Sequence, residues 1–121
     1  MLVSLNVLAQ TAHLRDIQPS KSFENIHVVP LESNEHASEF IVFIKQKVKA
    51  HYHKKHTEMV YVISGEADFT LDNITTSVKA GDFMRILPGQ IHSVKVTSKE
   101  ALKVLSIQAP QFDGKDRVFV E

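Results

Sequence analysis

The sequence contains no cysteine, and only four glycines and four prolines interrupt its 121 residues. Without cysteine, disulfide bonds, thiolate metal sites and cysteine nucleophiles are excluded. Fourteen basic residues balance fourteen acidic ones, so no net charge attracts nucleic acid or an anionic membrane. No apolar run approaches the length of a membrane span. We therefore expect neither a nucleic-acid partner nor a membrane partner.

The length fits one domain, and a chain of this size can bury a core without disulfides. The composition, with 43% hydrophobic and 23% charged residues, is ordinary for a soluble protein. One basic cluster is present. We interpret it as a solvated strand edge and loop, and the alternative is that it steers an anionic ligand. Its members are Lys45, Lys47, Lys49, Lys54 and Lys55.

The opening segment MLVSLNVLAQ resembles the end of a signal peptide, with Ala9 as a cleavage position. It is short, however, and its first cation is Arg15. We interpret residues 1–24 as an N-terminal arm or strand, with an export-signal remnant at 1–10 as the alternative, and residues 25–121 as one barrel domain. We therefore favour a cytoplasmic location, with a periplasmic one as the alternative.

Short segments rich in Val, Ile, Phe and Thr fill the rest of the chain, separated by turn residues, which is typical of many short strands. Asp72-Asn73 predicts a tight hairpin turn. Only residues 5–16 have a helical pattern, and it is weak. So many strands in one small domain predict an all-β sandwich or barrel. The predicted strands are 25–31, 39–48, 59–64, 67–71, 75–78, 83–87, 92–96, 102–108 and 117–120.

Three histidines and a glutamate stand at predicted strand ends and turns: His51, His53, Glu58 and His92. Side chains two positions apart in a strand share a face, so His51 and His53 point the same way. Glu58 begins a strand whose same-face neighbours are apolar, where an unpaired carboxylate is costly. Three imidazoles and a carboxylate suit one divalent transition metal, whether iron, manganese, nickel, copper or zinc. Taken one by one, these residues are equally typical of surface and turn positions.

Two motifs in this region resemble those of the cupins. Residues 51–65 read His-x-His, four residues, Glu, six residues, Gly. The second motif opens with Gly-Asp at Gly81 and runs through Gly89 to His92. The chain resembles a small, single-domain cupin of the cupin 2 type.

The chain departs from the family pattern at turn and scaffold positions. Lys45 stands where a glycine often begins the first motif. The family's usual proline falls at Leu87, and Pro88 stands one place later. A late asparagine is replaced by Val96. These departures concern loop geometry more than the metal ligands.

The resemblance implies a double-stranded β-helix, or RmlC-like jelly roll, with the metal inside one end of the barrel. It also implies a homodimer. Three apolar residues on the outward side of the strand that Glu58 begins would form a buried or partner-facing surface. They are Met59, Tyr61 and Ile63.

Four further polar residues are weaker candidates. We expect His56 to hydrogen-bond near the barrel mouth or to be exposed, with a substrate or proton-transfer role as the alternative. Arg85 could anchor a carboxylate or phosphate, although an outward orientation on an edge strand is the more ordinary interpretation. Gln90 and Gln108 are candidates of the same kind.

The leading functional hypothesis is a metal-dependent enzyme that acts on a small oxygenated metabolite, by oxygenation, isomerisation or lyase chemistry. The alternatives are a non-catalytic module that binds a metal-chelated small molecule, and a structural β-domain with an adventitious site. The sequence has no phosphate-binding glycine loop and no serine-nucleophile motif. A second ionisable group facing the metal would favour acid–base catalysis, whereas an apolar cavity would favour binding or dioxygen chemistry.

Overall fold

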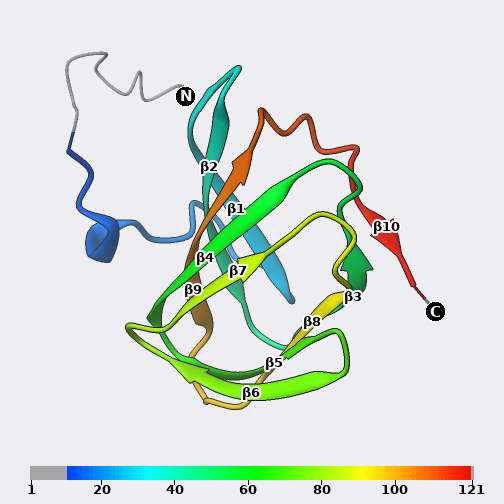
Figure 1. The fold of residues 1–121 in the computed structure, drawn as a ribbon. Helices are drawn as coiled ribbons and strands as arrows, with labels where there is room; N and C mark the ends of the chain where they lie inside the picture. The colour runs from blue at the N-terminus through cyan, green and yellow to red at the C-terminus, as the bar shows by residue number, and fades with distance from the viewer. Residues whose placement is uncertain (1–10, 121) are drawn as a thin grey trace.

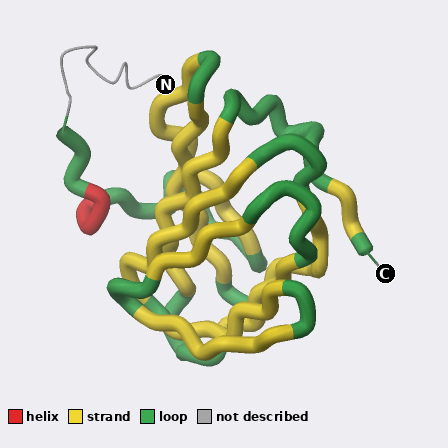
Figure 2. Tube along the Cα trace, in the orientation of Figure 1, coloured by secondary structure: helices red, strands yellow, loops and turns green. Residues whose placement is uncertain are grey.

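A computed structural model describes residues 11–120 as a β-barrel of ten strands (Figure 1). Strands make up the body of the barrel and loops gather at its ends (Figure 2). Within residues 11–120 the one helical element is a 3-10 turn, η1 (Leu14–Asp16), and no helix there is long and apolar enough to cross a membrane. The strands are β1 (Ile26–Asn34), β2 (Ala37–Ile44), β3 (Lys47–Tyr52), β4 (Thr57–Ser64), β5 (Glu66–Leu71), β6 (Ile74–Lys79), β7 (Phe83–Ile86), β8 (His92–Val96), β9 (Leu102–Ala109) and β10 (Val118–Phe119).

The strands form two five-stranded antiparallel sheets that face each other. One sheet has the order β1-β2-β9-β4-β7 and the other the order β10-β3-β8-β5-β6. Strands that follow each other in the sequence often lie in opposite sheets, because the chain crosses between the layers as a jelly roll does. The all-β jelly-roll prediction is confirmed.

The predicted hairpin at Asp72-Asn73 is also confirmed. Both residues have positive φ, at 44° and 73°, as a two-residue turn with the twist of its strands requires. It joins β5 to β6.

The prediction of one continuous strand over residues 39–48 is wrong. The chain turns between β2 and β3, and the side-chain oxygen of Asn25 accepts hydrogen bonds from the backbone N–H groups of Gln46 and Lys47, both at 3.0 Å. A residue distant in sequence therefore stabilises this turn. Residues 45 and 46 include no glycine or proline that would predict it.

The segment before β1 is tied to the outside of the first sheet. Lys103 on β9 is only 5% exposed, and its Nζ donates hydrogen bonds to the carbonyl oxygens of Leu14, at 2.6 Å, and Arg15, at 3.3 Å. The sequence predicts a weak helical pattern over residues 5–16. Within the described part of that segment, residues 11–16, the helical element is the 3-10 turn η1. The export-signal interpretation of residues 1–10 lies outside the described residues, and the arm–barrel boundary stays a prediction.

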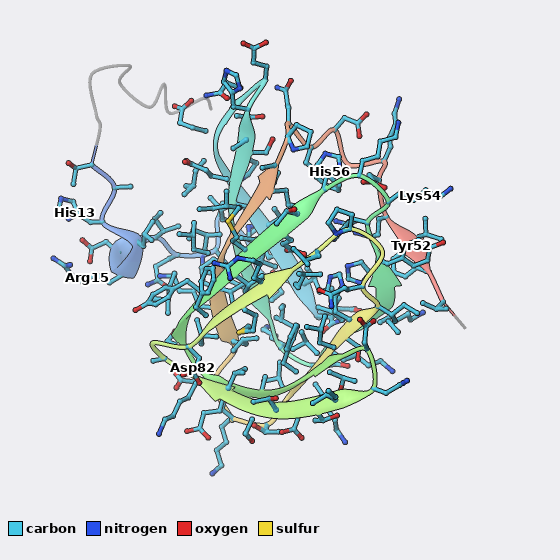
Figure 3. The ribbon with its side chains drawn as sticks, viewed as in Figure 1. His13, Arg15, Tyr52, Lys54, His56 and Asp82 are labelled. Atoms are coloured by element: carbon cyan, nitrogen blue, oxygen red, sulfur yellow. The ribbon has the colours of Figure 1, made fainter. Side chains whose placement is uncertain are left out.

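The most deeply buried apolar residues lie toward one end of the barrel, and polar residues gather at the other. Val62 on β4, Ala67 on β5 and Leu102 on β9 are each at most 1% exposed. Between β4 and β5 the chain turns at Gly65, which lies against the backbone of Leu102. Asp82, near this closed end, and His56, near the opposite end, lie far apart in Figure 3.

Candidate metal centre

The four predicted ligands come from both sheets and meet inside the barrel end opposite Gly65. His51 lies in β3 and pairs in register with His92, the first residue of β8. His53 follows directly after β3, and Glu58 is the second residue of β4 in the other sheet. The jelly-roll crossing thus brings together residues that are up to 41 positions apart.

The three histidines form one buried cluster. One ligand atom from each imidazole lies within 4.8 Å of the others, and all three side chains are at most 5% exposed. The rings of His51 and His92 have centroids 4.2 Å apart. Among the described residues these three rings make their hydrogen bonds to other groups and none to one another, so their proximity needs another partner.

Each histidine is oriented by a backbone carbonyl. Nδ1 of His51 donates to the oxygen of Lys49 at 2.8 Å, and Nδ1 of His92 donates to that of Gln90 at 3.1 Å. Nδ1 of His53 donates to the carbonyl of Asp116 at 2.5 Å. Since a carbonyl only accepts, Nδ1 holds a proton in each ring, and in a neutral ring the Nε2 lone pair is then left for a ligand. This is the usual arrangement of metal-binding histidines.

Glu58 lies beside two of these histidines. Its Oε1 lies 3.2 Å from Nε2 of His53 and 3.3 Å from Nε2 of His92. Its Oε2 accepts a hydrogen bond of 2.6 Å from the hydroxyl of Ser106. Burial opposes the charge of Glu58, but these imidazoles and the hydroxyl outweigh it and hold the pKa of the carboxyl well below its usual range.

The pKa values of His51 and His53 shift in opposite directions. Burial lowers the pKa of His51 to about 4, so its ring is neutral near pH 7. Burial opposes the charge of His53 too, but its hydrogen bonds to Glu58 and to the carbonyl of Asp116 outweigh burial and raise its pKa. Proton and metal would compete for the same nitrogen of His53.

The donor set fits a divalent transition metal. Nε2 of His92 is buried, and its only polar neighbour among the described residues is the Glu58 carboxylate 3.3 Å away, with which it makes no well-formed hydrogen bond. A buried donor or acceptor without a partner is costly, and a cation shared with Glu58 would satisfy it. Imidazole nitrogens with one carboxylate oxygen suit iron, manganese, nickel, copper and zinc, so the set does not select one ion.

Asp116 joins the C-terminal segment to the loop that carries His53. Its carboxylate accepts hydrogen bonds from the backbone N–H groups of Lys54, at 2.7 Å, and Lys55, at 2.8 Å, and from Nδ1 of His56, at 2.5 Å. Against the cost of burial, these donors lower the pKa of Asp116 below its usual range. Through its backbone carbonyl, the same residue orients His53.

His56 lies beside this centre with both ring nitrogens in hydrogen bonds. Nδ1 contacts Asp116, Nε2 lies 2.9 Å from the carbonyl of Gln111, and the residue is 6% exposed. Figure 3 places it near the loop that carries Lys54. These contacts support the hydrogen-bonding interpretation of His56 over the proton-transfer one.

The other three candidates have different surroundings. Arg85 is exposed on β7, where its guanidinium lies 5.2 Å from the ring centroid of Phe83, and it does not line the cavity at the metal centre. The amide of Gln90 stabilises a turn, since it accepts from the N–H of Leu87 and donates to Asp72. Gln108 is 4% exposed and does line the cavity.

Sequence reasoning missed Ser106 and Asp116. Ser106 could have been found, because it has the same parity as Gln108 on a predicted strand and stands among apolar residues. Asp116 carries no such signal, since it lies in an irregular segment and acts through a contact that only the folded chain makes.

Comparison with known proteins identifies the family. The pattern described as "Cupin domain" matches residues 38–108 of this chain. An Aquifex aeolicus protein described as uncharacterized is 36% identical over 100 residues, which cover 83% of this chain and 82% of that protein. The chain belongs to the cupin family.

Solved structures share the fold. A Klebsiella pneumoniae protein with a double-stranded β-helix domain superposes with a TM-score of 0.77 at 23% identity, over 93% of this chain and 98% of that one. Streptomyces Pac13, solved with uridine, superposes with a TM-score of 0.73 at 15% identity, over 93% and 91% of the two chains. At these identities the likeness establishes the fold alone.

Proposed function

We propose that this cupin is a metal-dependent enzyme acting on a small oxygenated metabolite, with His51, His53, Glu58 and His92 as the ligands of one divalent transition metal. The observation that carries the proposal is the close approach of three buried imidazoles, with the Glu58 carboxylate beside Nε2 of His53 and Nε2 of His92. A metal bound there would supply a Lewis acid or orient dioxygen.

The cavity beside the ligands favours oxygenation among the candidate reactions. Isomerases and lyases move protons and need a positioned acid or base. Among the described residues, the polar side chains of the buried wall beyond the ligands are Ser106 and Gln108, neither of which titrates. Lys47, Lys49, Asp113 and Arg117 also line the cavity but are exposed. The alternative, a module that binds a small molecule without turnover, shares the same metal.

Elemental analysis of purified protein tests the metal. We expect about one transition-metal ion per chain, as purified or after reconstitution. The variant His92→Ala should fold and bind the ion at least about 100-fold more weakly, because it loses a ligand. His36→Ala is the control, since His36 is 83% exposed and does not line the cavity at the metal centre. Absence of metal even after reconstitution would refute the proposal, and unchanged affinity in the variant would remove His92 from the ligand set.

We also infer a homodimer through the outer face of the first sheet. Tyr61 is 43% exposed and Phe83 is 51% exposed, and they pair in register on β4 and β7. Leu105 pairs with Tyr61 on its other side. Adjacent exposed aromatic residues of this kind are enriched in protein interfaces.

Sedimentation equilibrium measures the oligomeric state directly. The protein should have twice the mass of one chain, and Tyr61→Lys should shift it toward the monomer by placing a charge in the interface. The control is Ile74→Lys on β6, where Ile74 is 71% exposed and lies in the other sheet. A monomeric wild-type protein would contradict the inference.

A further inference from the structure

A cavity of about 610 Å³ lies between the two sheets and reaches the metal centre. His51, Glu58 and His92 line it at one end, and Val78 and Leu102 line it toward the closed end of the barrel. This volume falls within the range that encloses a small organic ligand. A molecule bound to the metal would therefore extend into this cavity.

The walls of the cavity are mostly apolar. Phe40 and Val42 from β2 face Phe69 and Val94 of the opposite sheet, and Val60, a core residue of β4, lines the cavity as well. Such walls offer no hydrogen bonds to replace the water around a polyhydroxylated molecule, so its burial would be unfavourable. An aromatic or branched aliphatic body would gain free energy there.

The cavity opens along the gap between β1 and β3. Ile26 and Val28 on β1 line the cavity and are 44% and 45% exposed. Exposed Lys47 and Lys49 on β3 lie across from them on the same opening. The entrance thus has an apolar side and a basic side.

Among the residues that the structure describes, the buried wall of the cavity contains one side-chain oxygen without a hydrogen-bond partner, that of Gln108. Gln108 is 4% exposed, and its Oε1 is buried and has no hydrogen-bond partner among the described residues. It pairs in register with Glu58, so it stands beside the metal centre. The nearby hydroxyl of Ser106 already donates to Glu58. A buried amide left without a partner destabilises the fold, which a bound donor group would relieve.

We propose that the substrate is a small molecule with an apolar body, an oxygen-donor group that binds the metal, and an N–H or O–H group that donates to Gln108. Gln108 is then a specificity-determining residue that contacts the substrate. This inference rests on the proposed metal function, because the oxygen donor is placed by the metal.

Two hydroxamates that carry the same chelating group test the class of substrate. Benzohydroxamate has an apolar body, and gluconohydroxamate has a polyhydroxylated one. Titration calorimetry of the metal-loaded protein should find benzohydroxamate bound at least about tenfold more tightly, because its ring is buried against apolar walls. Equal affinities, or a preference for gluconohydroxamate, would overturn the proposal.

The entrance gives a matched pair of variants. Val28→Glu should weaken benzohydroxamate binding by about tenfold or more, because it places a charge at the apolar side of the opening. Ile74→Glu should leave the affinity unchanged, since Ile74 is 71% exposed and does not line the cavity. An equal effect of both substitutions, or of neither, would contradict an apolar ligand in this cavity.

Gln108→Leu tests the polar contact. Benzohydroxamate should bind about fivefold more weakly, because it loses the amide that accepts its N–H group. The melting temperature of the ligand-free variant should rise, because the unpaired buried amide is gone. Unchanged affinity, or a lower melting temperature, would assign Gln108 to the structure alone and overturn its role in specificity.

Metal content, measured first on every sample, separates this inference from the proposed function. A protein that takes up no metal refutes the metal function, and the cavity is then probed with the apolar dye anilinonaphthalene sulfonate. Dye fluorescence that is lost in Val28→Glu and kept in Ile74→Glu supports an apolar ligand class. Absence of dye binding to the wild-type protein overturns it.

Discussion

The two ends of the barrel are built by different means. At the closed end, Val62, Ala67 and Leu102 are almost completely buried among apolar neighbours, and the chain turns at Gly65. At the other end, imidazoles, carboxylates and a hydroxyl are held by hydrogen bonds, many of them to backbone carbonyls.

The difference separates stability from chemistry. Apolar packing is non-directional and depends on close approach, so a bulky change at the closed end should lower the free energy of unfolding. Hydrogen bonds are directional and fix where a lone pair points, so a change at the metal end should lower metal affinity first. Matched substitutions at the two ends test whether the free energy of unfolding and the metal affinity can be changed separately.

The largest effect is expected from Gly65→Ala. At Gly65, φ is +87° and an added Cβ would lie 2.7 Å from the carbonyl oxygen of Ala101 and 2.7 Å from Cα of Leu102. Backbone strain and overpacking together should lower the free energy of unfolding by about 3–5 kcal/mol. Urea denaturation of the metal-free protein measures this loss.

Gly89→Ala is the matched substitution at the metal end. Its φ is +85°, almost the same, but nothing lies within 4 Å of the added Cβ. It should therefore cost only the strain of the left-handed conformation, about 1–2 kcal/mol. Similar losses in the two variants would contradict the special packing of the closed end.

The sequence predicts much of this architecture because period-two alternation and turn residues leave a local signal. Such patterns predict the hairpin turn at Asp72-Asn73 and the two strands on either side of Pro88. The turn at residues 45 and 46 has no such signal, since Asn25 stabilises it through hydrogen bonds that span 21 and 22 positions of the sequence. Propensity reports on neighbours in the sequence, and this contact is tertiary.

The same limit applies to the metal centre. His51 and His53 are two residues apart in one strand, so their common direction follows from parity alone. The meeting of Glu58 with His92 depends on the crossing of the two sheets, which their positions at strand ends indicate only together with the family motifs. The carbonyl of Asp116 that orients His53 has no sequence signature at all, because every residue has a carbonyl.

A smaller effect, on metal affinity, is expected from Asp116→Ala. The change removes the acceptor of the N–H groups of Lys54 and Lys55 and of His56, so the C-terminal segment loses its attachment to the loop. The carbonyl that orients His53 then moves more freely. Metal affinity should fall by about 10-fold to 100-fold, the usual cost of losing a group that positions a ligand.

Asp113→Ala controls for the loss of an acidic residue from the same segment. Asp113 is exposed, and its side chain accepts one hydrogen bond, from the N–H of Lys115. Competition with a fluorescent chelator should give this variant wild-type affinity. If Asp116→Ala and Asp113→Ala lose metal affinity equally, the loss comes from the change in overall charge. The proposed role of Asp116 in positioning His53 is then wrong.

The smallest effect should come from Ser106→Ala, which removes the donor to Oε2 of Glu58 and leaves Oε1 untouched. One hydrogen bond to a charged group is worth about 1.5–3 kcal/mol, but water near the barrel mouth can replace part of it, so metal affinity should fall only about threefold to tenfold. Ser93→Ala is the control, because Ser93 neighbours His92 on β8 and its side chain makes no hydrogen bond among the described residues. Competition with the fluorescent chelator should distinguish Ser106→Ala from Ser93→Ala.

A loss of metal affinity in Ser106→Ala as large as that in His92→Ala would mean that the hydroxyl, and not the imidazoles, holds the carboxylate in place. The metal end would then depend on one contact, as the closed end depends on Gly65.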